Sequence, residues 1–232
     1  KGRVMDDLIE YLPFLLEGAV ITASVAIASA VVALVLGLVT ASLKLAPSRI
    51  SGAGAATYTT VIRGVPDLVL MLLIFFGGQA LVNDIGARFD WDYIDINPYF
   101  AGVVTIGFVF GAYFGETFRG AILAVPVGML EAGTAYGMTK WQVFLRILLP
   151  QMMRHALPGL GNNWLVLMKS TALVSVIGLN ELVFRAGQAG GSTRQPFIFY
   201  LFVAFVFLVF TTVSILGLRW LEKRYSVGVR RA

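Results

Sequence analysis

Long apolar stretches dominate the order of hydrophobic and polar residues along this chain. Three of them contain no charged residue: residues 18–43, 96–115 and 195–218, which are 26, 20 and 24 residues long. A helix needs about 20 apolar residues to cross the hydrocarbon core of a bilayer, because each residue adds about 1.5 Å along the helix axis. Each stretch therefore predicts a membrane-spanning helix.

Two further apolar stretches carry charge inside them. Residues 58–83 include Asp67, and residues 156–180 include Lys169 in their middle. Together the five stretches predict an all-α membrane protein with five transmembrane helices, forming a single transmembrane domain over residues 1–232. Because five is an odd number, the two ends of the chain are expected on opposite sides of the membrane.

The composition agrees with a lipid environment. Of the 232 residues, 58% are hydrophobic and only 13% are charged, whereas a soluble domain has about 25% charged residues. The net charge of +5 does not indicate nucleic-acid binding, because the basic residues are spread along the borders of the spans and are not gathered on one polar face.

The 18 lysines and arginines predict the orientation. The first loop, the long third loop and the C-terminal tail hold 12 of them, the opposite borders hold 5, and Lys169 within a span completes the total of 18. Basic residues collect on the cytoplasmic side of membrane proteins. We therefore predict a periplasmic N-terminus and a cytoplasmic C-terminus.

Several kinds of site are missing from the sequence. There is no cysteine, no second histidine to join His155 in a metal site, and no Gly-x-x-x-x-Gly-Lys-Ser/Thr loop to hold a nucleotide. We predict no metal, no cofactor and no enzymatic activity in this chain itself. Residues 1–17 lack an apolar core, so they are interpreted as an amphipathic lead-in on the outer surface and not as a secretory signal.

Residues 131–150 form a polar segment, interrupted by glycine, between two spans. Helix-forming residues on both sides of Gly137 predict two short helical pieces that are joined there. Lys140 and Arg146 cannot lie in hydrocarbon, so the segment must lie on a membrane face where another protein can bind it. We assign it to a cytoplasmic loop over residues 119–155.

A candidate polar site begins the second span, at Arg63-Gly64-Val65-Pro66-Asp67. Gly64 and Pro66 predict irregular backbone, which is tolerated at membrane depth where it lines a cavity or packs against protein. Asp67 either faces such a cavity or forms an ion pair with Arg63 one turn earlier. The sequence leaves both possibilities open.

Glu116 closes the third span in the segment Gly111-Ala112-Tyr113-Phe114-Gly115-Glu116-Thr117-Phe118-Arg119-Gly120. The small residues in this segment predict close helix packing. Glu116 either lines a polar pathway or pairs with Arg119 one turn later.

The fourth span carries Lys169, Ser170 and Thr171. A lysine in the middle of a spanning helix is costly unless it meets a carboxylate, water or a ligand. Its expected partners are Glu116 and Asp67. Lys169 therefore either binds a ligand or neutralises one of these carboxylates.

The polar segment resembles the cytoplasmic loop of the permease subunits of ATP-binding-cassette (ABC) importers. That loop reads Glu-Ala-Ala, three residues, Gly, nine residues, then Ile-x-Leu-Pro. The matching positions in this chain are Glu131, Ala132, Gly137, Ile147, Leu149 and Pro150. Gly133 replaces the second alanine and weakens the first short helix.

Four more segments resemble the polar amino-acid branch of these permeases. They are Arg63-Gly64-x-Pro66, Ala112-Tyr113-x-x-Glu116-x-x-Arg119-Gly120, Asn162-Asn163-Trp164 and Lys169-x-Thr171-x-Leu173-x-Ser175. The resemblance implies the type I ABC importer fold in a bacterial inner membrane. It also implies four kinds of partner: a second similar or identical permease subunit, two cytoplasmic ATPase subunits that bind ATP and Mg, a periplasmic substrate-binding protein, and membrane lipid.

Asp67 and the tail at residues 222–229 resemble permeases for histidine, lysine, arginine and ornithine, which implies a basic amino acid as the substrate. Asp67 and Glu116 could then bind its cationic side chain. Lys169, Ser170 and Thr171 could bind its carboxylate. A gradient-driven amino-acid transporter is the alternative, because intramembrane charges can also relay protons.

Overall fold

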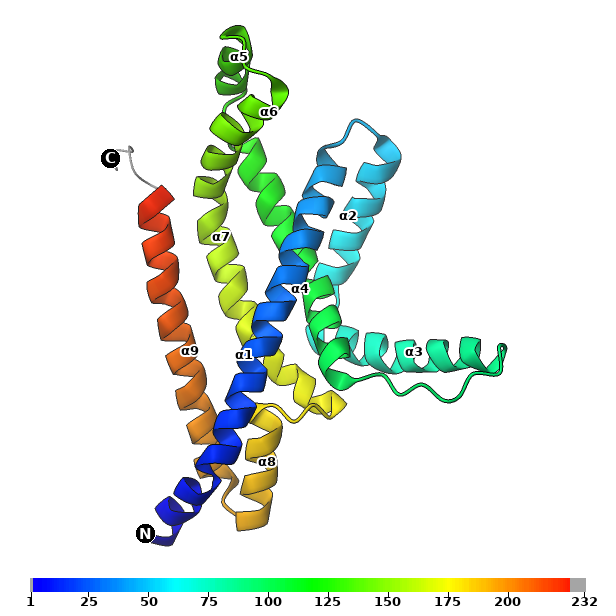
Figure 1. Cartoon of the computed structure of the whole chain (residues 1–232), viewed down its shortest axis with the longest axis vertical. Coiled ribbons are helices and arrows are strands. Elements are labelled where there is room, and N and C mark those ends of the chain that lie inside the picture. Colours follow the sequence, from blue (N-terminus) through cyan, green and yellow to red (C-terminus); the bar gives the residue numbers. More distant parts are fainter. Residues whose placement is uncertain (1, 226–232) are drawn as a thin grey trace.

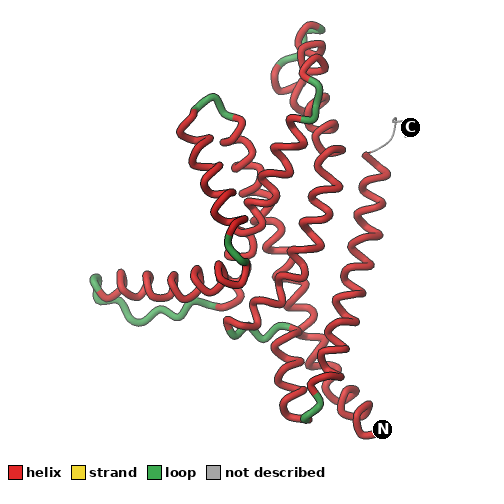
Figure 2. Tube along the Cα trace, turned by 180° about the vertical axis from the view of Figure 1, so that it is seen from behind, coloured by secondary structure: helices red, strands yellow, loops and turns green. Residues whose placement is uncertain are grey.

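The structure is a computed structural model that describes residues 2–225, with side chains from residue 6 onward. Within this range the chain forms helices and connecting loops, with no strand (Figures 1 and 2). The elements are α1 (Gly2–Leu45), α2 (Arg49–Gly64), α3 (Asp67–Ala87), α4 (Pro98–Leu123), α5 (Val127–Ala135), α6 (Lys140–Val143), a π-helix η1 (Phe144–Leu148), α7 (Leu149–Ser170), a 3₁₀-helix η2 (Thr171–Ile177), α8 (Leu182–Thr193) and α9 (Pro196–Tyr225).

Four of these helices are long and apolar enough to cross a membrane, and a fifth span results if the bent pair formed by residues 140–177 and α8 is counted as one. The four are α1, α3, α4 and α9. The all-helical prediction is confirmed, and the described part of the chain is consistent with four or five spans.

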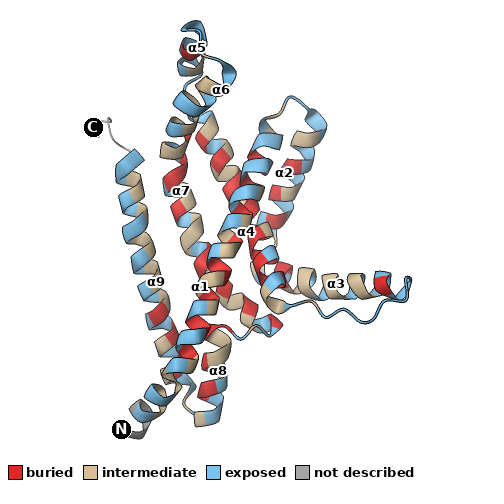
Figure 3. Ribbon diagram, in the orientation of Figure 1, coloured by how far each residue is buried: buried red, intermediate tan, exposed pale blue. Residues whose placement is uncertain are grey.

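Helix α4 is the centre of the molecule. Of its most apolar stretch 61% is buried, compared with 11% for α3 and for α9 (Figure 3). It packs closely along α1 because Gly107, Gly111 and Gly115 share one face, and a Cβ atom on any of them would lie within 2.8 Å of an α1 side chain. Small residues at this spacing let two helices approach closely in a membrane.

The start of α1 differs from the predicted surface lead-in. Residues 2–17 continue the same helix as the first span, and Leu15 is fully buried against α8 and α9. The Tyr11 ring meets Phe199 edge-on at 5.7 Å, and its hydroxyl lies 3.1 Å from that of Ser192. Tertiary packing near the N-terminus therefore buries a stretch that looks merely amphipathic in the sequence.

The second predicted span is broken where the irregular backbone was expected. Residues 58–64 end α2 and residue 67 begins α3, with Val65 in extended conformation before Pro66. A residue before proline avoids the helical region, and proline has no N–H to continue the helix. In Figure 1, α3 consequently leaves the end of α2 and runs across the long axis of the molecule.

The fourth predicted span, residues 156–180, is also interrupted. Helix α7 ends at Ser170, continues as the tighter η2, and stops at Gly178, which has a φ of 87°. Glu181 then caps α8, which is bent by 53° from the preceding helix. The cap is buried: Glu181 accepts hydrogen bonds from the Phe184 N–H at 2.9 Å and from the Thr22 hydroxyl at 3.0 Å.

Candidate functional site

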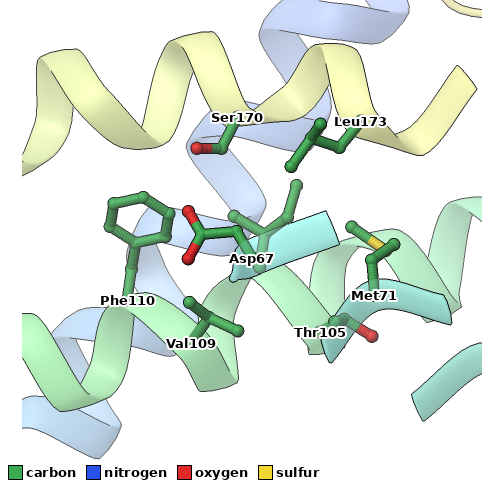
Figure 4. A pocket seen from close by; sticks show the side chains of 8 residues that line it. Asp67, Met71, Thr105, Val109, Phe110, Ser170 and Leu173 are labelled. Atoms are coloured by element: carbon green, nitrogen blue, oxygen red, sulfur yellow. The ribbon is translucent and has the colours of Figure 1, made fainter. Parts of the chain in front are cut away.

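Asp67 lies in a small cavity lined by residues of four elements, α3, α4, α7 and η2 (Figure 4). Its carboxylate points toward the Ser170 hydroxyl at the end of α7, and Val109 and Phe110 of α4 flank it. The other lining residues are Met71, Thr105, Ile106 and Leu173. The cavity volume is about 10 Å³, which is room for about one water molecule. This Asp67 pocket must widen to admit an amino acid.

The alternative ion pair between Asp67 and Arg63 does not form among the described residues. The break at Pro66 separates the two residues, so they no longer share the face of one helix. The Arg63 guanidinium instead lies 5.2 Å from the centre of the Tyr113 ring, a cation–π contact with α4. Of the two possibilities that the sequence left open, the cavity is the one that the structure contains.

Glu116 takes part in a polar junction of four residues: Lys44, Thr59, Glu116 and Arg119. Its Oε1 accepts hydrogen bonds from the Lys44 ammonium and, at 3.1 Å, from the Thr59 hydroxyl. Its Oε2 accepts one from Arg119 Nε at 3.0 Å. The pair with Arg119 is therefore present, and both carboxylate oxygens are occupied within the protein.

Lys44 and Thr59 were not singled out in the sequence. Lys44 directly follows the first apolar run and was counted only as a border charge, and Thr59 is one of many small hydroxyl residues in the spans. Lys44 and Thr59 are 15 residues apart on two helices joined by the short α1–α2 turn. This spacing is the one sequence signal that could have indicated their contact. Nothing local links either residue to Glu116, because the contact joins three helices.

Lys169 does not meet the partners that were expected for it. It is exposed, and within residues 6–225 it makes no ion pair with Glu116 or Asp67. Lys44 occupies Glu116 instead, and successive residues point in directions about 100° apart on a helix, so Ser170 faces the cavity while Lys169 does not. Thr171 is fully buried, and its hydroxyl donates to the Met168 carbonyl at 2.7 Å.

Residues 127–148 contain the two predicted helical pieces, α5 and α6. We name them the coupling segment, after the role in ATPase coupling that the resemblance implies for this loop. Gly137 joins them with a φ of 79°, which is easily adopted only by glycine. The Gly137 N–H donates to the Thr134 carbonyl and the Met138 N–H to the Gly133 carbonyl, which is the Schellman pattern that closes a helix. Thr139 and Gln142 then form a capping box that starts α6.

The other motif positions divide into an exposed and a packed set. Glu131, Ala132 and Pro150 are exposed, whereas Ile147 and Leu149 are half-buried. The packed set supports the fold of the segment: a Cβ atom at Gly133 would lie 2.5 Å from Ile147 Cδ1, so glycine lets the two elements approach. Pro150 has no N–H to donate to residue 146, and it lies in the first turn of α7, which follows the wider turn of η1.

Aromatic side chains are exposed on the coupling segment. Tyr136 is 88% exposed and Trp141 is 66% exposed, and the Trp141 ring stacks on Phe144 at 5.5 Å. Large aromatic residues on a protruding surface are typical of protein interfaces. The segment extends beyond the ends of α2 and α9 at one end of the molecule (Figure 1).

The family is shown by comparison with known proteins. Residues 33–227 match the family described as "Binding-protein-dependent transport system inner membrane component". The chain belongs to this family. As a permease it is 55% identical to the histidine/lysine/arginine/ornithine transport system permease protein HisQ of Escherichia coli, over 94% of this chain and 96% of the relative.

Two more similarities extend this finding. The octopine transport system permease protein OccQ of Rhizobium meliloti is 42% identical, over 94% of this chain and 92% of the relative. The crystal structure of an amino acid ABC transporter with histidines matches with a TM-score of 0.79 at 30% identity, covering 94% and 96% of the two chains. The permease therefore has the type I ABC importer fold and is an inner-membrane component of an ABC importer, which excludes the gradient-driven alternative.

Proposed function

We propose that this chain is the transmembrane subunit of an ATP-driven importer that moves basic amino acids from the periplasm to the cytoplasm by alternating access. The observation that carries the proposal is the 55% identity, over nearly the whole chain, with a permease for histidine, lysine, arginine and ornithine. The Asp67 pocket supports it, since the pocket offers a carboxylate to a cationic substrate.

Asp67 and Ser170 are the proposed substrate contacts. The carboxylate would accept hydrogen bonds from the guanidinium, ammonium or imidazolium of the substrate, and the Ser170 hydroxyl would hold its orientation. Roles for Glu116, Lys169 and Thr171 stay predictions. Glu116 would first have to release Lys44 and Arg119, and Thr171 would have to leave its bond to Met168.

The proposed assembly contains a second homologous permease, two cytoplasmic ATPase subunits and a periplasmic substrate-binding protein. ATP and Mg would bind to the ATPase subunits. The coupling segment, with Glu131, Gly137 and the exposed Trp141, would dock into an ATPase subunit. The exposed apolar faces of α3 and α9 would contact the second permease and lipid.

The proposed orientation has the coupling segment in the cytoplasm. The α1–α2 turn, α5, α6 and the end of α9 lie toward one end of the molecule, and the start of α1 lies toward the other (Figure 1). Basic residues within or next to the segments at the first end are Lys44, Arg49, Lys140, Arg219, Lys223 and Arg224, which supports a cytoplasmic position for that end. The cytoplasmic loop would then comprise residues 119–155, although its flanks belong to α4 and α7.

The test is the Asp67→Asn variant in the purified complex, reconstituted with its binding protein. A lost charge-assisted hydrogen bond costs about 1.5–3 kcal/mol, so arginine uptake should fall by about 10- to 150-fold. The ATPase subunits should still co-purify, because Asp67 lies far along the chain from the coupling segment. Asp92→Asn, in an exposed loop, is the matched control. Unchanged arginine and histidine uptake in Asp67→Asn would remove Asp67 from the site.

A further inference from the structure

The polar junction joins three helices at one level. Lys44 comes from the last turn of α1, Thr59 from α2, and Glu116 and Arg119 from α4. The side chains of Lys44 and Glu116 are only 12% and 19% exposed. Lys44 Nζ donates to Glu116 and, at 2.6 Å, to the Thr59 hydroxyl. Lys44, Thr59 and Glu116 therefore each contact both of the other helices, and Lys44 is the residue through which α1 takes part in the junction.

Helix α2 is also held on α4 below the junction. The Tyr58 hydroxyl donates to the Phe108 carbonyl, and the Tyr58 and Phe108 rings are 4.9 Å apart. Arg63, in the last turn of α2, lies over Tyr113. These contacts and the junction fix α2 along its second half, so α2 and α4 should move together.

The junction lies between the coupling segment and the Asp67 pocket along both helices. From Glu116, α4 continues to Leu123 and leads through Pro126 into the coupling segment. From Thr59, α2 runs to Gly64, and Asp67 follows directly after the break. A displacement of α5 that is carried by α4 can therefore reach Asp67 through the junction and α2.

We propose that Lys44 is a positioning residue for transport: through Glu116 and Thr59 it locks the α1–α2 hairpin to α4, so that movement of the coupling segment repositions Asp67. This inference rests on the proposed function. Opening the lock would leave Glu116, whose side chain is only 19% exposed, with Arg119 as its remaining charged partner, and removing one partner of a poorly solvated carboxylate is unfavourable. Lys44 touches no substrate in this arrangement and acts through α2.

The first test measures coupling in the reconstituted complex with its ATPase and binding protein. Lys44→Met keeps the length of the side chain and removes the charge. We expect arginine uptake per ATP hydrolysed to fall by about 5-fold or more, a change of the size that coupling between sites produces, while ATP hydrolysis continues. Lys44→Arg should restore the ratio. Arg49→Met, which removes an exposed charge from the same hairpin, should leave the ratio unchanged.

A double variant separates a lost lock from a folding defect. Lys44→Met with Glu116→Gln leaves no buried charge unpaired, so its yield and thermal stability should recover toward wild type. If the lock matters, its coupling ratio stays low. A double variant that recovers its coupling ratio together with its stability would refute the role of Lys44, as would a normal ratio in Lys44→Met.

The second test does not depend on which amino acid is carried. The chain has no cysteine of its own, so Val65→Cys places one thiol at the α2–α3 break. Its rate of maleimide labelling should change when ATP and vanadate are added, and this change should disappear in the Lys44→Met background and persist with Lys44→Arg. An ATP-dependent change that persists with Lys44→Met overturns the inference. If the labelling rate changes as expected but basic amino acids do not stimulate ATP hydrolysis, the proposed substrate is refuted and the proposed role of Lys44 is not.

Discussion

The coupling segment and the polar junction satisfy their polar groups in opposite ways: the first with partners that are close in sequence, the second with partners that are distant. In the coupling segment, caps and turns come from residues that are close in sequence: Gly133 to Met138, and Thr139 to Gln142. In the junction, Glu116 meets Lys44, which is 72 residues away. The first is exposed and shaped by local rules, and the second is buried and exists only because helices far apart in the sequence are packed together. Local defects should therefore disturb docking, and distant contacts should govern stability and coupling.

The largest effect is expected for Gly137→Val. A β-branched residue at a φ of 79° is strained by about 1–3 kcal/mol, and relief of that strain would redirect α6 and its exposed Trp141. We expect the ATPase to be lost from the purified complex and uptake to be abolished, while the membrane helices remain folded. Gly128→Ala is the control, since Gly128 has no neighbour within 4 Å and an ordinary helical φ. Normal co-purification with Gly137→Val would contradict the role of this turn.

A smaller effect, of a different kind, is expected for Glu181→Ala. This change removes the cap of α8 and leaves the buried Thr22 hydroxyl without its carboxylate partner, so the complex should lose about 1–3 kcal/mol of stability. Thermal unfolding in detergent should shift to lower temperature, with the ATPase still bound below the transition. Glu17→Ala is the control, because the Glu17 side chain is 70% exposed and Arg185 keeps its hydrogen bonds to the Phe14 and Asn180 carbonyls, so the loss should be about 0–1 kcal/mol. Equal shifts for both variants would count against a structural role of the buried cap.

Thr139→Ala should act more weakly and only in the coupling segment. It removes one half of the capping box, a loss of about 1 kcal/mol, because Thr139 no longer accepts from the Gln142 N–H. We expect ATPase affinity for the complex to fall by about 5-fold, without a change in thermal stability of the spans. Thr139→Ser keeps the acceptor and should behave as wild type. A fall in the thermal stability of the spans would show that the effect of Thr139→Ala is not confined to the coupling segment.

Gly133→Ala should have the smallest effect, and it tests whether packing between α5 and η1 matters more than the helix propensity of α5. It restores the alanine of the family pattern and raises helix propensity by about 1 kcal/mol, but the new methyl group would lie 2.5 Å from Ile147 Cδ1. Because that atom is the end of a flexible side chain, we expect a net change within about 0.5 kcal/mol. Binding of the ATPase to the purified complex measures it. A severe loss of binding would mean that the close approach of α5 and η1 is essential.

Much of this fold could be predicted from the order of apolar residues. The uncharged runs at 18–43, 96–115 and 195–218 coincide with α1, α4 and α9 except for residues 96, 97 and 195, which precede the last two helices. An uninterrupted apolar sequence of that length favours a spanning helix. The hinge at Gly137 and the irregular backbone before Asp67 were also predicted, since glycine and proline act on the residues next to them. The structure corrected where helices are continuous and where they are interrupted. Residues 2–17 belong to the same helix as the first span, and the predicted spans at 58–83 and 156–180 are each broken into separate helices.

The candidate site could be predicted only in part. Asp67 and Ser170 were both singled out, but their approach across a cavity with α4 depends on helix packing that leaves no local signal. The pairing of Glu116 with Arg119 one turn later was among the predicted possibilities and is present, but its contacts with Lys44 and Thr59, and the exposure of Lys169, were missed for the same reason. A residue such as Lys44, at the end of an apolar run, is interpreted from the sequence as a charge at the membrane border. That interpretation is the same whether or not a neighbouring helix places a carboxylate next to it.

The junction also has a consequence for how the chain is made. Lys44 and Thr59 leave the ribosome before Glu116 does, since synthesis runs from the N-terminus. When Glu116 enters the bilayer, Lys44 and Thr59 are thus already inserted. Their contacts with the carboxylate can then offset the free-energy cost of burying it. We expect Lys44→Met to lower the yield of correctly inserted chains, a loss that would arise during translation, before any ATPase subunit is bound.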